Sequence, residues 1–73
     1  MVIRPLSYRK VHKRLLDLGF QPIRQKGSHV FYENAEGLTT VVPRHEGEEI
    51  GRGLLRKICK DIEVDPEEFY SGA

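Results

Sequence analysis

The fold is decided by the stretch Lys26-Gly27-Ser28-His29-Val30-Phe31-Tyr32, in which two turn residues separate two runs typical of β-strands. Gly27 and Ser28 favour a turn, and the β-branched and aromatic residues after His29 favour a strand. The stretch therefore predicts a β-hairpin whose second strand begins at His29. Histidine is the side chain that most readily takes up or releases a proton near neutral pH, so His29 is the first candidate for chemistry. The alternative, a packed or solvated histidine without a role, remains open at this point.

The segment before the hairpin has the pattern of an amphipathic helix. Its apolar residues recur at helical spacing, at Tyr8, Val11, Leu15 and Leu18. Ser7 is suited to the N-cap, and Gly19 to a left-handed residue after the last turn, which would let Phe20 fold back on Leu15. The outer face of this predicted helix is basic.

Three strands are expected after this helix, at residues 21–26, 29–33 and 38–42. Pro22 cannot donate a ladder hydrogen bond, so the first strand should lie at an edge of the sheet. Pro43 stops the third strand. Because short loops join successive strands, we expect an antiparallel meander.

The rest of the chain predicts a polar loop at residues 44–49 and a second helix. Apolar residues recur every four positions at Ile50, Leu54, Ile58 and Ile62. Gly51 and Gly53 mark the start of that helix or a close approach of another backbone. A short terminal turn carrying Phe69 and Tyr70 should begin at residues 65–68. The expected fold is thus α+β, a single small domain over residues 1–73, in helix–three strands–helix order with two helices covering a three-stranded antiparallel sheet.

Charge is segregated along the 73 residues. Up to Tyr32 there are seven basic residues and one acid, whereas from Glu33 onward there are five basic residues and ten acids, so that the formal net charge is only +1. We expect the basic half to meet a polyanion such as a nucleic acid and the acidic half to face elsewhere. No run approaches the ~20 apolar residues of a membrane span, and the N-terminus has no signal pattern. The single Cys59 suits a reducing cytoplasm.

The potential metal ligands His12, His29, His45 and Cys59 have no local ligand spacing, so no metal or cofactor is expected. His12 is interpreted as a residue at the boundary of the first helix's apolar stripe. Ser28 and His29 would point to opposite faces of a strand, and Cys59 lies in an apolar pattern, so neither suggests a nucleophile.

A histidine among cations is suited to cleaving a phosphodiester by the 2′-hydroxyl of RNA itself. There the protein need only move protons and stabilise charge on the phosphate. Arg24, Lys26 or Arg44 could supply the positive field. The Gly27 backbone would allow close approach of the phosphate.

The chain resembles the HicA family of small ribonuclease toxins from type II toxin–antitoxin modules. The resemblance rests on ordered motifs, namely Leu18-Gly19-Phe20, Lys26-Gly27-Ser28-His29, Val42-Pro43-Arg44-His45, Glu49-Ile50 with Gly53 and Leu55, and Glu67-Glu68-Phe69. It implies an α-β-β-β-α fold similar to a double-stranded-RNA-binding domain. It also implies metal-independent cleavage of mRNA and neutralisation by a HicB-type antitoxin that covers the active site.

The family's catalytic histidine, in Gly-Ser-His, corresponds to His29. The residues expected to contact RNA are Arg9, Lys10, Lys13, Arg24, Lys26, Gly27, Ser28, Arg44 and His45. His45 matches a recurrent family position, for which both a structural and a substrate-contacting role are open. Leu54 stands where the family usually has threonine, which could weaken the toxin without touching His29.

The alternative from another class is a non-catalytic RNA-binding module of the same fold. A double-stranded-RNA binder would be expected to carry lysines at the start of its last helix. Here Glu46, Glu48 and Glu49 precede that helix and would repel phosphate, which favours the toxin.

Overall fold

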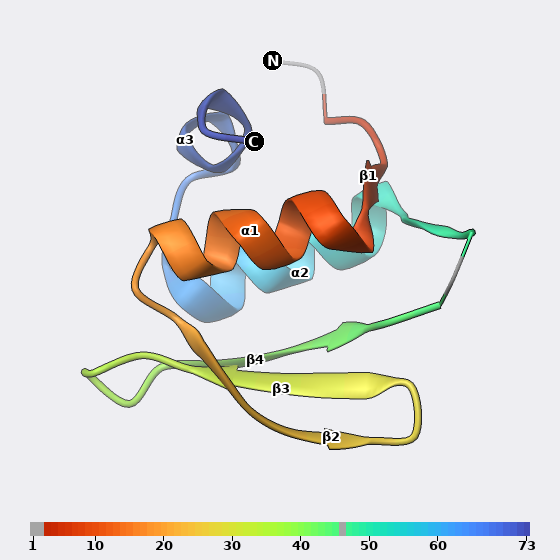
Figure 1. Ribbon diagram of the computed structural model, residues 1–73. Helices are drawn as coiled ribbons and strands as arrows, with labels where there is room; N and C mark the ends of the chain where they lie inside the picture. Colours follow the sequence, from red (N-terminus) through yellow and green to blue (C-terminus); the bar gives the residue numbers. More distant parts are fainter. Residues whose placement is uncertain (1–2, 46) are drawn as a thin grey trace.

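The computed structural model describes residues 3–45 and 47–73, and Glu46, one of the acids discussed above, lies outside this range. The elements in chain order are β1 (Leu6–Ser7), α1 (Tyr8–Asp17), β2 (Gln21–Lys26), β3 (His29–Glu33), β4 (Thr39–Pro43), β5 (Glu49–Ile50), α2 (Arg52–Ile62) and α3 (Pro66–Ser71). Strands β2, β3 and β4 form an antiparallel sheet, and α1 and α2 lie side by side on one face of it (Figure 1). The α+β class and the expected order of the main elements are confirmed.

The hairpin predicted at Gly27 and Ser28 is present. Lys26 pairs with His29, which leaves a two-residue loop. Gly27 has φ of +59°, and no other described loop residue of this hairpin has a positive φ, the pattern of a type II′ turn. As expected from Pro22, β2 is an edge strand. Its register shifts between Pro22 and Arg24, a bulge that leaves Ile23 about half exposed.

Helix α1 begins and ends as its sequence predicts. The Ser7 hydroxyl accepts a hydrogen bond from the Lys10 amide. At the other end, the Phe20 amide donates to the Leu15 carbonyl at 2.9 Å and the Gly19 amide to the Leu16 carbonyl at 3.0 Å, with Gly19 at φ of +92°. This is a Schellman ending, and it turns the chain directly from α1 into β2.

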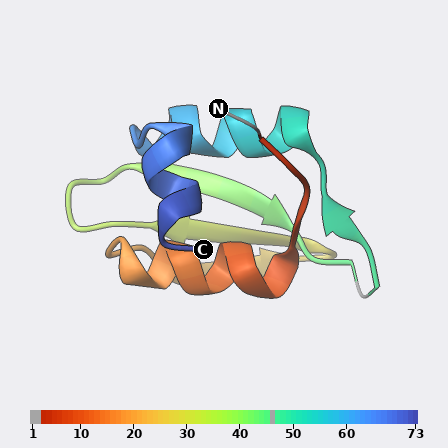
Figure 2. The ribbon, with the colours of Figure 1, turned by 90° about the horizontal axis from the view of Figure 1, so that it is seen from above.

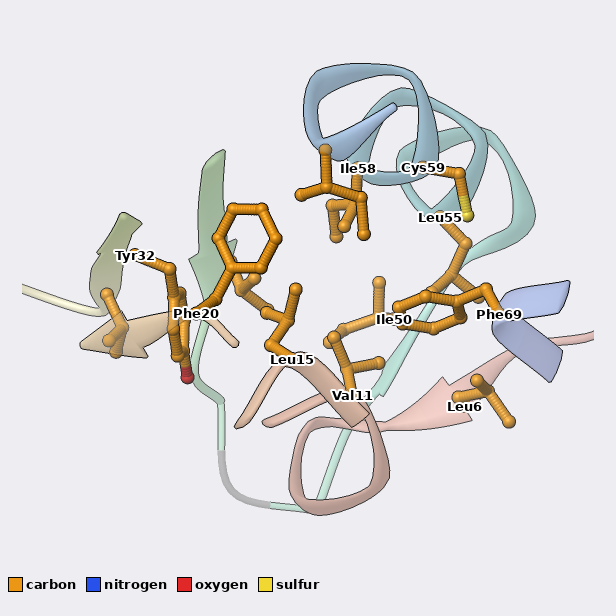
Figure 3. Close-up of a cluster of buried hydrophobic side chains, with 13 residues drawn as sticks. Leu6, Val11, Leu15, Phe20, Tyr32, Ile50, Leu55, Ile58, Cys59 and Phe69 are labelled. Carbon is orange, nitrogen blue, oxygen red and sulfur yellow. The ribbon is translucent and has the colours of Figure 1, made fainter. Parts of the chain in front are cut away.

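The core lies between the sheet and the helices (Figure 3). Because strand residues alternate between faces, Val30, Tyr32 and Val42 point towards α1 and α2. The hydrophobic core cluster takes residues from every element except β2, and Phe20 from the turn after α1; its buried members are Leu6, Val11, Leu15, Phe20, Val30, Tyr32, Val42, Ile50, Leu55, Ile58, Cys59, Ile62 and Phe69. All six residues of the edge strand β2 are exposed.

Two expectations at the level of elements are corrected, and one is extended. Ile50 is not helical: it pairs with Leu6 in the short β1–β5 ladder, and α2 begins at Arg52 after Gly51 as N-cap. The terminal turn begins where expected and forms a six-residue helix, α3, which is capped by the Asp65 carboxylate and lies across the ends of α1 and α2 (Figure 2). Pro43 is the last residue of β4 rather than the residue that follows it, which is possible because β4 has a free edge.

Gly51 precedes α2 and Gly53 lies in its first turn, so these glycines mark the start of the helix and not a close approach of another backbone. A Cβ at Gly51 or Gly53 would have no heavy atom within 4 Å. No helix in residues 3–45 and 47–73 is long and apolar enough to cross a membrane.

Candidate functional site

His29 is the first residue of β3 and lies on the face of the sheet that the helices leave uncovered. In the register it stands between Lys26 on β2 and Pro43 on β4. Its side chain is exposed, and among the described residues none hydrogen-bonds to its imidazole. Both ring nitrogens are therefore available to a ligand from solvent.

The turn before His29 is held by two hydrogen bonds. The Arg44 amide donates to the Ser28 carbonyl at 2.5 Å, which extends the β3–β4 ladder past the end of the strands. The Gln25 side-chain amide donates to the Gly27 carbonyl at 3.0 Å. His29 is thus placed by ordered backbone on both sides, as expected from the sequence.

Two further expected residues share the uncovered face with His29. Arg24 pairs with Phe31, and its guanidinium carbon lies 4.4 Å from the centroid of the Phe31 ring. Lys26 pairs with His29 itself. This surface, which we call the outer face, therefore carries two cations, an aromatic ring and the candidate histidine.

A second group of expected residues lines a pocket on the helix side of the same end of the sheet. The pocket has a volume of about 670 Å³ and is lined by Ser7, Tyr8, Arg9, Gln25, Arg44, His45, Gly47, Glu48 and Glu49. The Arg44 guanidinium carbon lies 5.4 Å from the centroid of the Tyr8 ring. The start of α1, the β2–β3 turn and the segment after β4 meet at this end of the molecule (Figure 1).

The pocket contradicts one expectation from the charge pattern. Glu48 and Glu49 line it together with Arg9 and Arg44. The basic and acidic halves of the sequence therefore do not face apart here, because the loop after β4 folds back beside the start of α1. Carboxylates among the cations lower the positive potential that a phosphate would meet in this pocket.

Lys10 and Lys13 belong to neither group. Both are exposed on α1, outside the pocket and away from the outer face. The structure thus divides the expected RNA contacts into three sets. One lies on the outer face and in the adjoining β2–β3 turn, one lines the pocket, and the third consists of the two lysines on the surface of α1. Leu54, at the position where the family usually has threonine, is partly buried against the core.

A cluster of three hydroxyl and imidazole groups was not predicted. The Tyr32 hydroxyl lies 2.5 Å from that of Tyr8 and 2.7 Å from His12 Nδ1. Burial, followed by the hydrogen bond to Tyr8, raises the pKa of Tyr32 far above its ordinary value. The only sequence signal is the spacing of Tyr8 and His12, four residues apart on α1; their common partner comes from β3. His12 does lie at the boundary of the apolar stripe, as interpreted.

Cys59 is buried on α2, and burial raises the pKa of its thiol. A buried thiol with a raised pKa is a poor nucleophile, so the structural interpretation of Cys59 holds. Within the described residues, no group of three or more His, Cys, Asp or Glu side chains could hold a metal ion.

The chain matches the sequence model of a known protein family. The family model described as "HicA toxin of bacterial toxin-antitoxin" matches residues 8–64, from the start of α1 to just before α3. The match includes the β2–β3 hairpin, both helices that cover the sheet, and the residues that line the pocket from Tyr8 onward. No curated protein matches the chain.

Proposed function

The chain belongs to the HicA family of toxins from bacterial toxin–antitoxin systems, and on that premise we propose that it is an endoribonuclease that cleaves mRNA and thereby blocks translation. The observation that carries the proposal is the position of His29. Its side chain is exposed, has no hydrogen-bond partner among the described residues, and lies opposite Lys26 in the β2–β3 register. A histidine packed for structural reasons would be buried or paired. His29 is neither.

The chemistry we propose uses the nucleophile that RNA already carries. The His29 imidazole takes the proton of a 2′-hydroxyl, and the 2′-oxygen attacks the adjacent phosphorus. The bond from phosphorus to the 5′-oxygen breaks, and that oxygen takes a proton from the imidazolium or from water. The products are a 2′,3′-cyclic phosphate and a free 5′-hydroxyl. A well-placed acid or base contributes about 10²- to 10⁴-fold to such a reaction.

The cations have two roles in this proposal. Arg24 and Lys26 share the face with His29 and stabilise negative charge on the phosphate undergoing reaction. The remaining expected contacts would bind phosphates further along the strand, and they are Arg9, Lys10, Lys13, Gly27, Ser28, Arg44 and His45. Phosphate contacts give affinity that falls with salt but carry little sequence information.

The partner of this toxin is proposed to be a HicB-type antitoxin that covers the outer face, and the compartment is proposed to be the cytoplasm, where mRNA is found. Since the outer face is uncovered in the free chain, a partner seated on it would block access to His29 without any change in fold. We propose no metal or cofactor, and the domain is proposed to extend over all of residues 1–73.

The decisive experiment substitutes His29→Ala. RNA cleavage in vitro and growth arrest on expression should both be lost, while circular dichroism and the melting temperature stay those of the parent, because the side chain is exposed. Full cleavage activity in this variant would exclude the assignment. A variant of a cation outside both site groups, Lys60→Ala on α2, should retain cleavage and serves as the control.

Two further readouts separate this mechanism from others. Cleavage should persist in EDTA and leave 2′,3′-cyclic phosphate ends; loss on chelation would indicate a metal-dependent nuclease instead. If the purified protein binds labelled mRNA and yields no shortened product, the chain is a non-catalytic RNA-binding module.

A further inference from the structure

The Phe31 ring is an aromatic side chain that the core does not use. It belongs to β3, but alternation along the strand places it on the outer face, while its neighbours Val30 and Tyr32 are buried under the helices. In the register it lies between Arg24 on β2 and Val41 on β4, and it is only partly buried. An aromatic ring on an uncovered sheet face offers a flat surface to a ligand.

The Arg24 guanidinium lies over this ring. Its central carbon lies 4.4 Å from the Phe31 ring centroid, closer than the 5.4 Å of Arg44 over Tyr8 or of Arg4 over Tyr70. Within residues 3–45 and 47–73, no carboxylate forms an ion pair with Arg24. The guanidinium is therefore held against an aromatic ring while its charge and its hydrogen-bond donors remain open to a ligand.

The distance from this pair to His29 would allow one nucleotide to reach both, with its base at the pair and its phosphate at His29. Phe31 follows His29 by two residues on the same strand and points to the same side, which corresponds to roughly 7 Å along β3. A nucleotide whose base lies on Phe31 or Arg24 would thus have its sugar and phosphate within the neighbourhood of His29 and Lys26.

We propose that Arg24 and Phe31 form a stacking platform for one unpaired nucleobase beside the scissile phosphate, an inference that rests on the proposed function. Planar guanidinium and aromatic groups stack on the faces of bases, and every base has such a face. A base within a duplex is already stacked on both sides and does not reach the platform. The platform would therefore make this chain a reader of single strands, although its element order is that of double-stranded-RNA-binding domains.

The test is an abasic scan with protein that binds but does not cleave. In the His29→Ala background, fluorescence anisotropy measures binding of a short single-stranded oligoribonucleotide and of a series in which each nucleotide in turn lacks its base. At one position, the loss of the base should weaken binding by about 5- to 150-fold, the usual contribution of one base stacked on an aromatic group.

Protein variants then assign that loss to the platform. Phe31→Leu keeps an apolar side chain, and Arg24→Lys keeps the positive charge, but each removes one half of the platform. Both variants should bind the intact oligonucleotide as weakly as the abasic one, so that the missing base no longer weakens binding. Phe31→Tyr keeps the ring and should retain the penalty, as should the control Lys60→Ala. The His29→Ala background is common to all of these proteins.

The outcomes separate the two proposals. If no abasic position weakens binding, or if the penalty survives unchanged in both Phe31→Leu and Arg24→Lys, the platform is excluded even when the parent protein cleaves RNA. Absence of cleavage by the parent protein excludes the nuclease function, and the scan still decides whether the platform binds a base.

Discussion

The Tyr32 hydroxyl on β3 lies 2.7 Å from Nδ1 of His12 on α1, a hydrogen bond that joins the sheet to the helix above it. Tyr8, one turn earlier on the same helix, reaches the same hydroxyl. Figure 3 shows Tyr32 at one end of the core cluster, with its oxygen pointing out of the cluster. One tyrosine thus contributes its ring to the core and its hydroxyl to a polar contact at the core's boundary.

We expect Tyr32→Phe to lower the free energy of unfolding by about 1–2 kcal/mol, because the hydroxyl loses two partners while the ring still fills the core. Urea unfolding followed by circular dichroism measures the change. Tyr8→Phe removes the contact with Tyr32 and a long one to His12 Nδ1 at 3.5 Å, but it leaves the Tyr32–His12 hydrogen bond in place and should cost less. A Tyr32→Phe protein as stable as the parent would show that the cluster contributes nothing to stability.

The same tyrosine should make the protein sensitive to alkali. Burial, followed by the hydrogen bond to Tyr8, raises the pKa of Tyr32 in the folded state. Above the unfolded-state value near 10, the unfolded chain releases a proton that the native chain retains, so stability falls as pH rises. The slope from this group is about 1.4 kcal/mol per pH unit. This limiting slope is reached only well above pH 10, so urea unfolding between pH 9 and pH 11 should show a total loss of stability that is smaller by about 1.4 kcal/mol in Tyr32→Phe; equal losses would contradict the prediction.

Cys59 should be protected from thiol reagents in the native protein. Its side chain is buried, and burial raises the pKa of its thiol, so that little thiolate forms and little of it is accessible. Labelling with a chromogenic disulfide at pH 8 should be negligible in buffer and complete in denaturant. Fast labelling of the folded protein would contradict the position of this residue in the core.

The two partners of Asp61 should differ in importance. Its carboxylate accepts a hydrogen bond from the buried Thr40 hydroxyl and one from the exposed Lys57 ammonium, each at 3.0 Å. Asp61→Ala leaves the Thr40 hydroxyl buried without its partner and should cost about 1–3 kcal/mol. Lys57→Ala removes only an exposed i,i+4 ion pair, which contributes roughly 0.3–0.5 kcal/mol. Equal losses in urea unfolding would contradict this ranking.

Gly27→Ala should destabilise the hairpin that carries His29. At φ of +59°, a residue with a Cβ costs about 1–2 kcal/mol, although there is open space around the position. Gly53→Ala is the matched control: it lies in the first turn of α2, also in open space but without a positive φ, and should stabilise the protein by about 0.4–1 kcal/mol. The two variants should therefore move the melting temperature in opposite directions. A shift in the same direction would contradict the role of the turn.

The parts of the fold that follow from local rules could be predicted from the sequence. Ser7 and Gly19 bound α1 as their capping preferences indicate, and the turn before His29 forms where Gly27 permits it. Ile50 shows where such reasoning fails. It continues the four-residue spacing of Leu54 and Ile58, yet it pairs with Leu6, and a two-residue ladder between distant segments has no periodic pattern of its own.

The candidate site was predictable in its residues but not in its arrangement. The motif identifies His29 as a candidate, whereas the division of the cations between the outer face and the pocket depends on how α1 docks on the sheet. Docking likewise brings Glu48 and Glu49 beside Arg9, which the charge pattern along the chain did not indicate. In the sequence, Phe31 looks like any aromatic residue of a β-strand, and only its position opposite Arg24 in the folded sheet marks it as a candidate for binding.

The end of the sheet that carries the pocket is assembled from the start of α1, the β2–β3 turn and the loop after β4, and the core beneath the helices is completed by Phe69 on α3. No contiguous fragment of the chain contains this arrangement. Phe69 on α3 closes a core whose other buried residues all precede it in the chain, so the core depends on contacts between segments that are far apart in the sequence.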